Sequence, residues 1–398
     1  MKQELKKLSL ALGSVAVFRG VLEDPVISGM RMLIAAAEGS ETSSIIGQYG
    51  RFVGTLYEQT VNFSEYVLKT VLEDENIFIV RTARGGDIDE YILEAAENEL
   101  LVLQELSRLS PETFTDGLDY SGFLPQWRVC SIDFLAEYKR RRANISQFGY
   151  GKWAQSSMFT LRDGRIVPLR YPDPQRLSEL YGYERERKAV VDNTLALLDG
   201  KPAQNALLYG DAGTGKSSTV KAIVNEYSDR GLRLIEITKE QLRDIPRIIG
   251  EISENPLKFI LFIDDLSFAA GEDCFGALKA VLEGSASARS SNMVIYATSN
   301  RRHLVRESFS EREGDDIHRN DTMQETLSLS ARFGLRVSFG RPDKKSYTAI
   351  ARELARSRGI ELPDSELDLK AEQFALSSGN GRSPRTAKQF VDTLINNS

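Results

Sequence analysis

The amino-acid sequence predicts an α/β fold, with a parallel sheet between helices, a mostly helical region before it and a small helical region after it. The sheet is predicted from apolar runs that alternate with helical segments: Ala206–Tyr209, Leu232–Ile237, Phe259–Ile263 and Met293–Ala297. Runs that are apolar on both faces are typical of parallel strands covered by helices on each side. A short further strand is expected at Arg336–Phe339, and beyond Gly340 the strand-like runs end.

These changes of pattern predict three domains. Residues 1–170 are expected to form a mostly helical N-terminal domain that recognises a partner or substrate. Residues 171–340 would form the α/β core, and residues 341–398 a helical lid. The segment Arg170–Pro174 is predicted to be a linker, because each proline restricts its own backbone and that of the preceding residue.

Helical spacing supports the two flanking regions. Apolar residues recur at three- and four-residue steps, as on one face of a helix, in three sets: Leu5, Leu8, Leu12 and Val15; Ile92, Ala96, Leu100, Leu103 and Leu106; and Ala387, Phe390, Val391 and Leu394. Tyr347, Ile350 and Leu354 predict a further lid helix. Two strand-like pieces, Ile77–Arg81 and Met158–Leu161, interrupt the N-terminal pattern.

Composition limits the class of protein. The chain has 398 residues and a formal net charge of −6, which argues against a wholly basic nucleic-acid binder but allows a local basic patch. Cys130 and Cys274 have no metal or redox spacing, and His303 and His318 are too few for a multi-histidine metal site. The first 18 residues superficially resemble a signal peptide, but their helical spacing favours an amphipathic helix. No stretch approaches the roughly 20 apolar residues of a membrane span, so we expect a cytoplasmic protein without a membrane partner.

A glycine-rich loop follows the first run of the predicted sheet. It comprises Gly210, Asp211, Ala212, Gly213, Thr214, Gly215, Lys216 and Ser217, and a helix-like stretch from Ser218 to Tyr227 comes next. A strand, such a loop and a helix are the context of a phosphate-binding P-loop, in which backbone N–H groups and the helix start attract phosphate. Lys216 would reach the β- and γ-phosphates, and the Ser217 hydroxyl would bind Mg²⁺. Residues 210–218 are therefore predicted to bind ATP.

Polar residues end the next strands of the predicted sheet. Asp264 and Asp265 follow the run Phe259–Ile263, and Asn300 follows Met293–Ala297. A P-loop enzyme needs one carboxylate for Mg²⁺, which we assign to Asp264, and one for the attacking water, which we assign to Asp265. Asn300 would hold that water. The alternatives are a helix cap at Asp265 and a turn at Asn300.

Two arginines are candidates for stabilising the charge on the γ-phosphate. Arg332 precedes the short strand Arg336–Phe339 and could act on the site of a neighbouring subunit, as an arginine finger does. Arg385 lies in the first turn of the last helix and could reach the phosphates from the lid, more readily than Arg382. The alternatives are a surface ion pair at Arg332 and a solvated helix end at Arg385.

These motifs, in this order, resemble those of the AAA+ ATPases: Walker A at Gly210–Ser217, Walker B at Asp264-Asp265, sensor 1 at Asn300, the arginine finger at Arg332 and sensor 2 at Arg385. The sequence around these motifs resembles even more closely that of one bacterial family, catalogued as an ATP-binding domain of unknown function. The segments that carry this resemblance are Asn205–Val220, Phe262–Phe268, Tyr296–Leu304 and Leu327–Leu335. In that family the segment Leu180–Glu184 would hold the adenine, and this implies a role for Tyr183. The resemblance covers residues 130–398 and implies Mg-ATP hydrolysis and ATP-dependent assembly into a ring or filament.

Two departures from the AAA+ pattern change what we expect. Walker B usually ends in Asp-Glu, as against Asp264-Asp265 here, and the shorter carboxylate predicts slow turnover. Bacterial replication initiators have the same pair. The segment Ile237–Asp244 lacks the aromatic and glycine residues of an unfoldase pore loop, so threading of polypeptide by aromatic paddles is not expected.

The partner is left open between a protein and a nucleic acid. The run Tyr138–Arg142, followed by Phe148, Tyr150, Lys152 and Trp153, could grip single strands through cations and stacked rings, although such runs are more often a solvated helix face beside a local core. The functional hypotheses are an ATPase that remodels a partner, an initiator- or loader-like ATPase on DNA, and an ATP-gated switch with little hydrolysis. A P-loop kinase of small molecules is disfavoured, because it does not need Asn300, Arg332 and Arg385 in this order.

Overall fold

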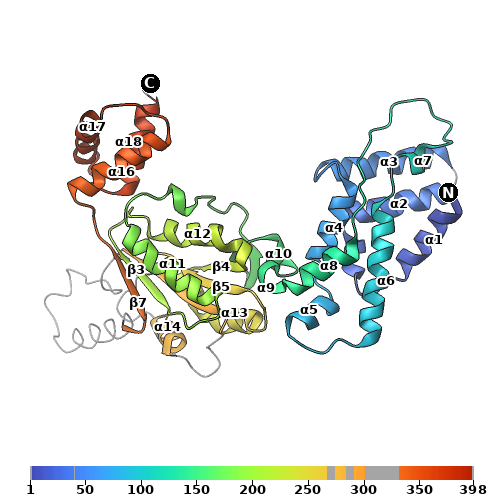
Figure 1. Cartoon of the computed structure of the whole chain (residues 1–398), viewed down its shortest axis with the longest axis horizontal. Helices are drawn as coiled ribbons and strands as arrows, with labels where there is room; N and C mark the ends of the chain where they lie inside the picture. The colour runs from blue at the N-terminus through green and yellow to red at the C-terminus, as the bar shows by residue number, and fades with distance from the viewer. Residues whose placement is uncertain (1, 40, 267–273, 284–290, 301–330, 397–398) are drawn as a thin grey trace. The chain divides into compact units, whose positions relative to one another are not determined.

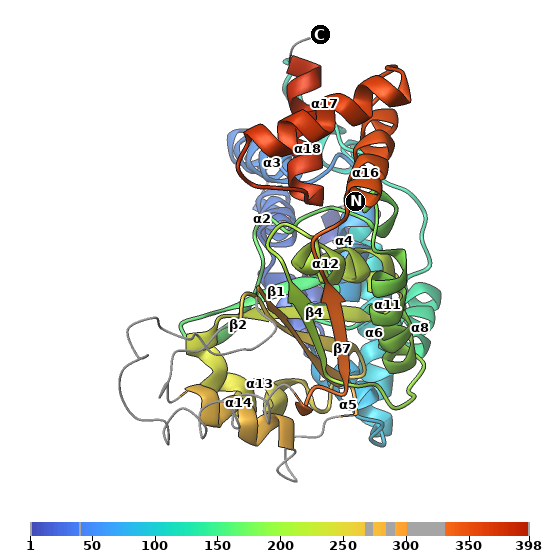
Figure 2. The same cartoon turned by 90° about the vertical axis from the view of Figure 1, so that its left-hand side faces the viewer.

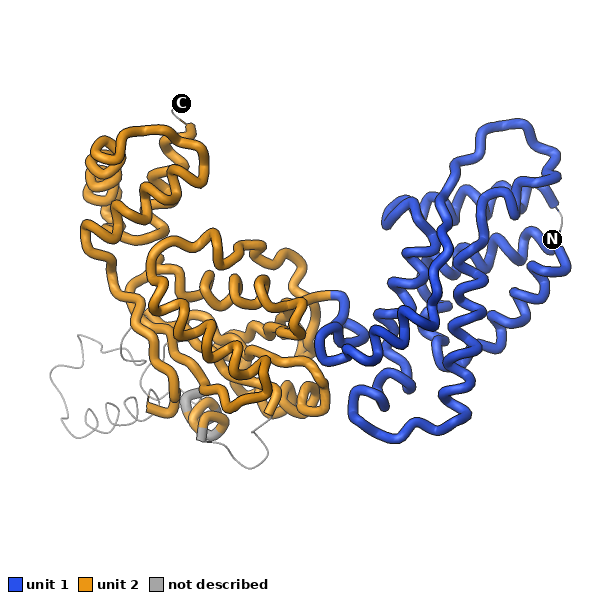
Figure 3. The backbone as a smooth tube through the Cα atoms, in the orientation of Figure 1, with its two compact units in different colours: residues 1–155 blue, residues 156–398 orange. Residues whose placement is uncertain are grey.

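The computed structural model of this chain describes residues 2–39, 41–266, 274–283, 291–300 and 331–396 (Figure 1). It comprises two compact units, residues 1–155 and 156–398 (Figure 3). Both histidines lie outside the described residues, as do parts of the family-like segments, namely 267–268, 301–304 and 327–330.

The first unit is helical, as predicted. Its helices are α1 (Lys2–Gly13), α2 (Pro25–Gly39), α3 (Thr42–Tyr57), α4 (Phe63–Glu73), α5 (Ile77–Ala83), α6 (Glu90–Ser107), α7 (Glu112–Thr115), α8 (Phe134–Ala143), α9 (Ile145–Phe148) and α10 (Lys152–Gln155), with a 3₁₀ turn at Arg19–Glu23. α1 buries Leu5, Leu8 and Leu12 in a single apolar core, where α6 contributes Ala96, Leu100, Leu103 and Leu106. The predicted apolar faces of both helices therefore point inward.

A buried carboxylate secures the segment after α1. Glu99 of α6 is 8% exposed, and its two oxygens accept the backbone N–H groups of Ala16, Val17 and Phe18 at 2.8, 3.1 and 2.9 Å. Because buried N–H groups need partners, this carboxylate replaces the helical hydrogen bonds that end with α1. It ties the start of the chain to α6.

One predicted strand of this unit is wrong. Ile77–Arg81 lies in helix α5, which Asn76 caps by accepting the N–H of Ile79 at 2.9 Å. An N-cap asparagine begins a helix, and the short apolar run then buries Phe78 and Ile79 against the helical core. Apolar character alone does not distinguish a short buried helix from a strand.

The second unit contains one seven-stranded sheet in the order β2-β1-β4-β5-β6-β3-β7. Its strands are β1 (Met158–Arg162), β2 (Arg165–Pro168), β3 (Ala206–Gly210), β4 (Leu232–Ile237), β5 (Lys258–Ile263), β6 (Met293–Ser299) and β7 (Leu335–Phe339). All neighbours are parallel except β1 and β2. The predicted strands of the core are thus confirmed, and β2 is an addition.

Helices cover both faces of this sheet. α11 (Glu184–Leu198) and α12 (Lys216–Tyr227) pack on one face, and α13 (Ile245–Ile252) and α14 (Cys274–Glu283) lie on the other (Figure 2). The lid consists of α16 (Lys344–Ser357), α17 (Asp364–Ser377) and α18 (Pro384–Asn396) around its own apolar core. The middle helix, α17, was not expected from the sequence.

The segment before the expected linker belongs to the core sheet. We expected residues 156–170 in the N-terminal domain, but β1 pairs with Leu234, Ile235 and Glu236 of β4, and β2 pairs with β1. The long-range pairing of β1 with β4 joins this hairpin to the second unit. Arg170–Pro174 accordingly connects two parts of one unit.

Candidate nucleotide site

The glycine-rich loop connects β3 to α12 at the carboxyl edge of the sheet. Gly210 has φ 137°, and a Cβ there would lie 2.1 Å from the Phe339 carbonyl oxygen, so a side chain is excluded by the neighbouring strand. Gly213 and Gly215 also have positive φ, at 78° and 90°. The glycines thus permit the tight turn that the P-loop prediction requires.

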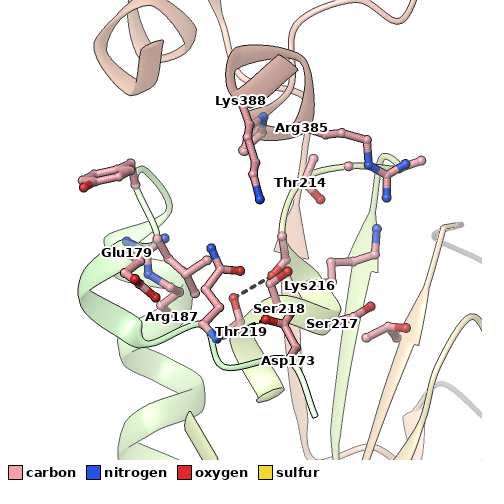
Figure 4. A pocket seen from close by; sticks show the side chains of 18 of the residues that line it. Asp173, Glu179, Arg187, Thr214, Lys216, Ser217, Ser218, Thr219, Arg385 and Lys388 are labelled. Carbon is pink, nitrogen blue, oxygen red and sulfur yellow. Dashed lines mark hydrogen bonds between the residues drawn. The ribbon is translucent and has the colours of Figure 1, made fainter. Parts of the chain in front are cut away.

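A cleft of about 530 Å³ opens beside this loop (Figure 4). Of the predicted ATP ligands it is lined by Ala212, Gly213, Thr214, Gly215, Lys216, Ser217 and Ser218. Gly210 and Asp211 are not among the residues that line it. The Asp211 carboxylate instead accepts the backbone N–H of Arg341, at 3.0 Å, and so connects the loop to the segment that enters the lid.

Lys216 is held at the centre of the cleft. Its Nζ donates to the carbonyl oxygens of Gly210 and Asp211 at 2.9 and 2.7 Å, and to Oδ1 of Asn300 at 3.0 Å. Burial lowers the pKa of the Lys216 ammonium, and the carboxylate of Asp211 opposes this shift. The lysine is 6% exposed, so a phosphate that entered the cleft would meet a poorly hydrated cation.

The two residues predicted to hold Mg²⁺ lie together. The Ser217 hydroxyl donates to Oδ1 of Asp264 at 2.6 Å, although 47 residues separate them. Among the described residues, no group of three or more His, Cys, Asp or Glu side chains could hold a metal ion alone. This donor set fits Mg²⁺, which usually binds through one or two carboxylates, water and substrate phosphates. Ser217 and Asp264 would therefore hold the ion together with the triphosphate.

The second carboxylate contacts the sensor 1 candidate. The Asn300 amide donates to Oδ1 of Asp265 at 2.8 Å, and Asp265 has the left-handed φ of 53°. The alternatives of a helix cap at Asp265 and a turn at Asn300 involve residues 267–273 and 301–330, which lie outside the described part of the chain. Since Asn300 also accepts from Lys216, it joins the phosphate-binding lysine to the candidate base.

The lid brings two cations to the cleft. Arg385 and Lys388 of α18 line it, and the backbone N–H of Arg385 donates to the Gly213 carbonyl at 3.2 Å (Figure 4). Neither side chain forms an ion pair with another described residue. Arg382 is occupied elsewhere, because its guanidinium binds both carboxylate oxygens of Glu372 at 2.8 Å. Lys388 was missed from the sequence, although it lies one helical turn after Arg385.

Apolar and polar groups line the far end of the cleft, where a base would lie. Leu180 and Tyr181 come from the chain before α11, and Ile350 and Leu354 from lid helix α16. Tyr183 is not brought to this cleft: its ring packs on Phe339 at 5.3 Å, and its hydroxyl donates to the Gly340 carbonyl. Tyr183 has a left-handed backbone conformation, at φ 60°. Leu180 and Tyr181, and not Tyr183, line the cleft where the sequence led us to expect Tyr183.

Arg332 also lies away from the cleft. It precedes β7, whose first residue Leu335 pairs with Ala206 and whose last residue Phe339 pairs with Gly210. At about 3.3 Å per residue, Leu335 lies roughly 13 Å along the strand from Phe339, and Arg332 precedes Leu335. Arg332 is not among the residues that line the cleft of its own subunit.

The basic and aromatic run of the first unit does not form a stacking surface. Tyr138, Tyr150 and Trp153 are buried, and the Arg141 guanidinium lies 4.4 Å from the centre of the Phe148 ring. Bases could not stack on rings that belong to a core. The local-core interpretation therefore holds for these aromatic residues.

The fold and the site define the class of protein. A parallel sheet with β4, β5, β6, β3 and β7 in this order, a P-loop after β3, an acidic pair after β5, an asparagine after β6 and a helical lid make this chain an AAA+ ATPase. Residues 153–398, more than half of the chain, match the family described as "Protein of unknown function (DUF815)". The chain belongs to that family.

The chain is also similar to curated proteins and solved structures outside this family. The chain is 32% identical over 129 residues to the replication factor C large subunit of Staphylothermus marinus, covering 29% of this chain and 30% of that protein. It is 24% identical over 357 residues to the ATP-dependent zinc metalloprotease FtsH of Leuconostoc mesenteroides, covering 85% of this chain and 48% of that protein. The chain thus spans less than half the length of these relatives. A Thermotoga maritima structure, the RuvB Holliday junction branch migration motor, is similar over 56% of this chain and 65% of its own, with 16% identity and a TM-score of 0.39.

In the part of the chain that the structure describes, no helix combines the length and apolar character needed to cross a membrane.

Proposed function

We propose that this chain binds ATP with Mg²⁺ in the cleft beside the P-loop and hydrolyses it to drive a conformational change. One arrangement carries the proposal. The metal-binding pair, Ser217 and Asp264, lies beside a connected series in which Asn300 joins Lys216 to Asp265. Metal, phosphate and water positions are thereby adjacent, as transfer of a γ-phosphoryl group to water requires.

Each residue has a separate role in this proposal. The loop N–H groups and Lys216 bind the phosphates, and Asn300 and Asp265 orient the attacking water, with Asp265 accepting its proton. When bound, Mg²⁺ would neutralise charge on the β- and γ-phosphate oxygens. Arg385 and Lys388 would draw the lid towards the anion, which supports a conformational change in the lid.

Phosphate release by the purified protein tests this function. We expect release that depends on Mg²⁺ and is lost in Lys216→Ala and Asp265→Asn. Asp265→Asn should retain ATP affinity, since this side chain acts on water. Equal rates in the wild type and both variants would exclude hydrolysis in this cleft.

We further propose that the site is completed by a second copy of the chain. The position of Arg332 supports this, because it precedes the start of β7, whereas the P-loop lies by the end of that strand, and it does not line the cleft of its own subunit. Mass measurements with and without a slowly hydrolysed ATP analogue test assembly into a ring or filament. A sharper test mixes Arg332→Ala, which binds ATP, with Lys216→Ala, which retains Arg332. Recovered hydrolysis in the mixture is expected, and a monomer in both conditions with full activity of Arg332→Ala would contradict the proposal.

An ATP-gated switch with little hydrolysis is the second candidate. It is favoured by Asp265, whose side chain is one methylene shorter than the usual glutamate. A nucleotide-dependent change of assembly without phosphate release would support the switch. The two candidates differ in turnover and agree on the binding site.

The partner is proposed to be a protein recognised by the helical first unit, with a nucleic acid as the alternative. Similarity to the replication factor C large subunit favours the alternative, whereas the burial of Tyr138, Tyr150 and Trp153 removes one surface for it. Binding of a labelled single strand at low and high salt discriminates, since phosphate contacts weaken steeply with salt. Absence of binding at low salt would leave the protein partner.

A further inference from the structure

Thr298 occupies a position between the two strands that end in the site. It is the penultimate residue of β6, the strand that lies beside β5, and is 2% exposed. Its hydroxyl donates to Oδ1 of Asp264 at 2.5 Å and accepts the backbone N–H of Asp265 at 2.9 Å. The same small group therefore contacts both members of the acidic pair.

The backbone of Thr298 adds a further contact to this junction. Its carbonyl oxygen accepts the N–H of Leu266 at 2.7 Å. Asp265 stands between these two contacts in the left-handed region, at φ 53°, which non-glycine residues adopt when their surroundings require it. This conformation accompanies the contact of the Asp265 carboxylate with Asn300.

The contacts of Asp264 indicate what the hydroxyl does when the site is loaded. Oδ1 of Asp264 accepts from Ser217, from Thr298 and from the N–H of Asp265, whereas no described residue donates to Oδ2. A Ser217 hydroxyl that binds Mg²⁺ would do so through an oxygen lone pair and could still donate its hydrogen to Asp264. Thr298 is the second side chain that donates to this oxygen of Asp264, and its hydroxyl is held by β6 and not by the P-loop helix.

From this geometry we propose that Thr298 is a positioning residue of the metal site: its hydroxyl presents Asp264 to Mg²⁺ and holds Asp265 in the conformation that faces Asn300. The inference rests on the proposed use of Mg-ATP. Groups that hydrogen-bond to metal ligands commonly change metal affinity or activity about 10- to 100-fold when they are removed. Thr298 lines the cleft, and its hydroxyl is engaged by both aspartates, so we assign it a role that acts through them.

The variants separate the hydroxyl from the shape of the side chain. Thr298→Val keeps the volume and loses the hydroxyl, and Thr298→Ser keeps the hydroxyl. Thr194→Val is the matched control, because Thr194 is also buried and its hydroxyl bonds to Tyr296 of the same strand, outside the cleft. If Thr298→Val does not fold, Thr298→Ala takes its place.

The measurement is metal binding, without turnover. Mn²⁺ is titrated into the full chain with a slowly hydrolysed ATP analogue and followed by electron paramagnetic resonance, and affinity for the analogue is measured with and without Mg²⁺. We expect Thr298→Val to bind Mn²⁺ about tenfold more weakly, with unchanged metal-free affinity, while Thr298→Ser and Thr194→Val resemble the wild type.

Two results would overturn the inference: unchanged metal binding in Thr298→Val, or equal impairment in Thr298→Ser, which would indicate packing alone. Failure of the proposed hydrolysis is a separate result. A wild type that binds the metal and analogue but releases no phosphate would leave this comparison intact.

Discussion

The side-chain nitrogen of Asn300 lies 2.8 Å from Oδ1 of Asp265. The two residues end neighbouring parallel strands, β6 and β5, so the sheet places them at one edge although 35 positions separate them. Because Asn300 also accepts from Lys216, the three side chains form one hydrogen-bonded series, and a change at any of them should alter the proposed γ-phosphate site.

Replacing Asn300 should slow hydrolysis more than it weakens binding. Asn300→Ala removes the partner of Asp265 and should lower the single-turnover rate about 100-fold, in the range found for loss of one preorganised donor. ATP affinity should change by only a few-fold, because Lys216 keeps its two loop carbonyl partners. Rapid-quench measurement of phosphate formation checks the rate, and an unaltered rate would remove Asn300 from the mechanism.

Lengthening the candidate base should increase turnover. Asp265→Glu restores the usual AAA+ carboxylate and extends it by one methylene towards the water. We expect faster phosphate release than in the wild type, with Mg²⁺ dependence retained. A slower Asp265→Glu enzyme would mean that the contact with Asn300 requires the shorter side chain.

Lys216→Ala should weaken nucleotide binding. A hydrogen bond to a charged group contributes about 1.5–3 kcal/mol, so affinity should fall roughly 10- to 100-fold. Lys221→Ala is the matched control on the same helix, because Lys221 forms an ion pair with Glu236 and does not line the cleft. Equilibrium binding of a fluorescent ATP analogue gives both affinities, and equal values would show that the loop does not bind phosphate.

The two lid cations should contribute differently to ATP and ADP. In Figure 4, Arg385 extends towards the Lys216 amine, whereas Lys388 extends from α18 towards the cleft near Ser218. We expect Arg385→Ala to lower the affinity for ATP more than the affinity for ADP. Lys388→Ala should lower the affinity for both nucleotides by about fivefold, and this loss should be smaller at high salt. Lys345→Ala, on an exposed part of the lid, is the control. Calorimetric titration with each nucleotide measures these differences, and identical values for all three variants would contradict the assignment.

Glu99→Ala should destabilise the helical unit. The change leaves the N–H groups of Ala16, Val17 and Phe18 without their acceptor, which should cost about 2–4 kcal/mol. Hydrogen exchange at these amides should increase, while nucleotide binding in the second unit stays the same. Exchange equal to that of the wild type would mean that water replaces the carboxylate.

Acidification should loosen the lid. The Arg382 guanidinium holds the pKa of Glu372 below its usual range, so this pair stabilises the lid above the unfolded pKa, about 4.3, and the contribution is lost as pH falls through the lower folded value. Hydrogen exchange in α17 and α18 between pH 3 and 6 tests this expectation. Arg382→Ala should reduce the pH dependence, and the part that remains would come from Asp364, whose pKa is lowered by Arg356 and Arg352. A variant with the full wild-type dependence would assign the effect to another group.

Local patterns in the sequence were sufficient for the core strands, the P-loop and the acidic pair. Strands that are apolar on both faces are stable only in a sheet covered by helices on each side, so these runs predict the core sheet. A strand, a glycine-rich loop and a lysine that follow one another directly in the sequence predict a P-loop. The place of Asn300 beside the acidic pair was also predictable from the sequence, because the carboxyl ends of parallel strands lie at the same edge of a sheet. Each of these inferences depends on neighbours in the chain or on the general geometry of a parallel sheet.

Tertiary structure decided what depends on distant partners. Only packing shows that Ile77–Ala83 is a helix, that β1 joins β4, that Tyr183 turns from the cleft and that the Thr298 hydroxyl contacts both aspartates. Hydrogen bonds and apolar contacts between residues far apart in sequence form only when the chain is folded, and they override weak local preferences. The sequence by itself therefore specified the glycine-rich loop and the acidic pair of the candidate site, and the fold determined which other side chains lie beside them.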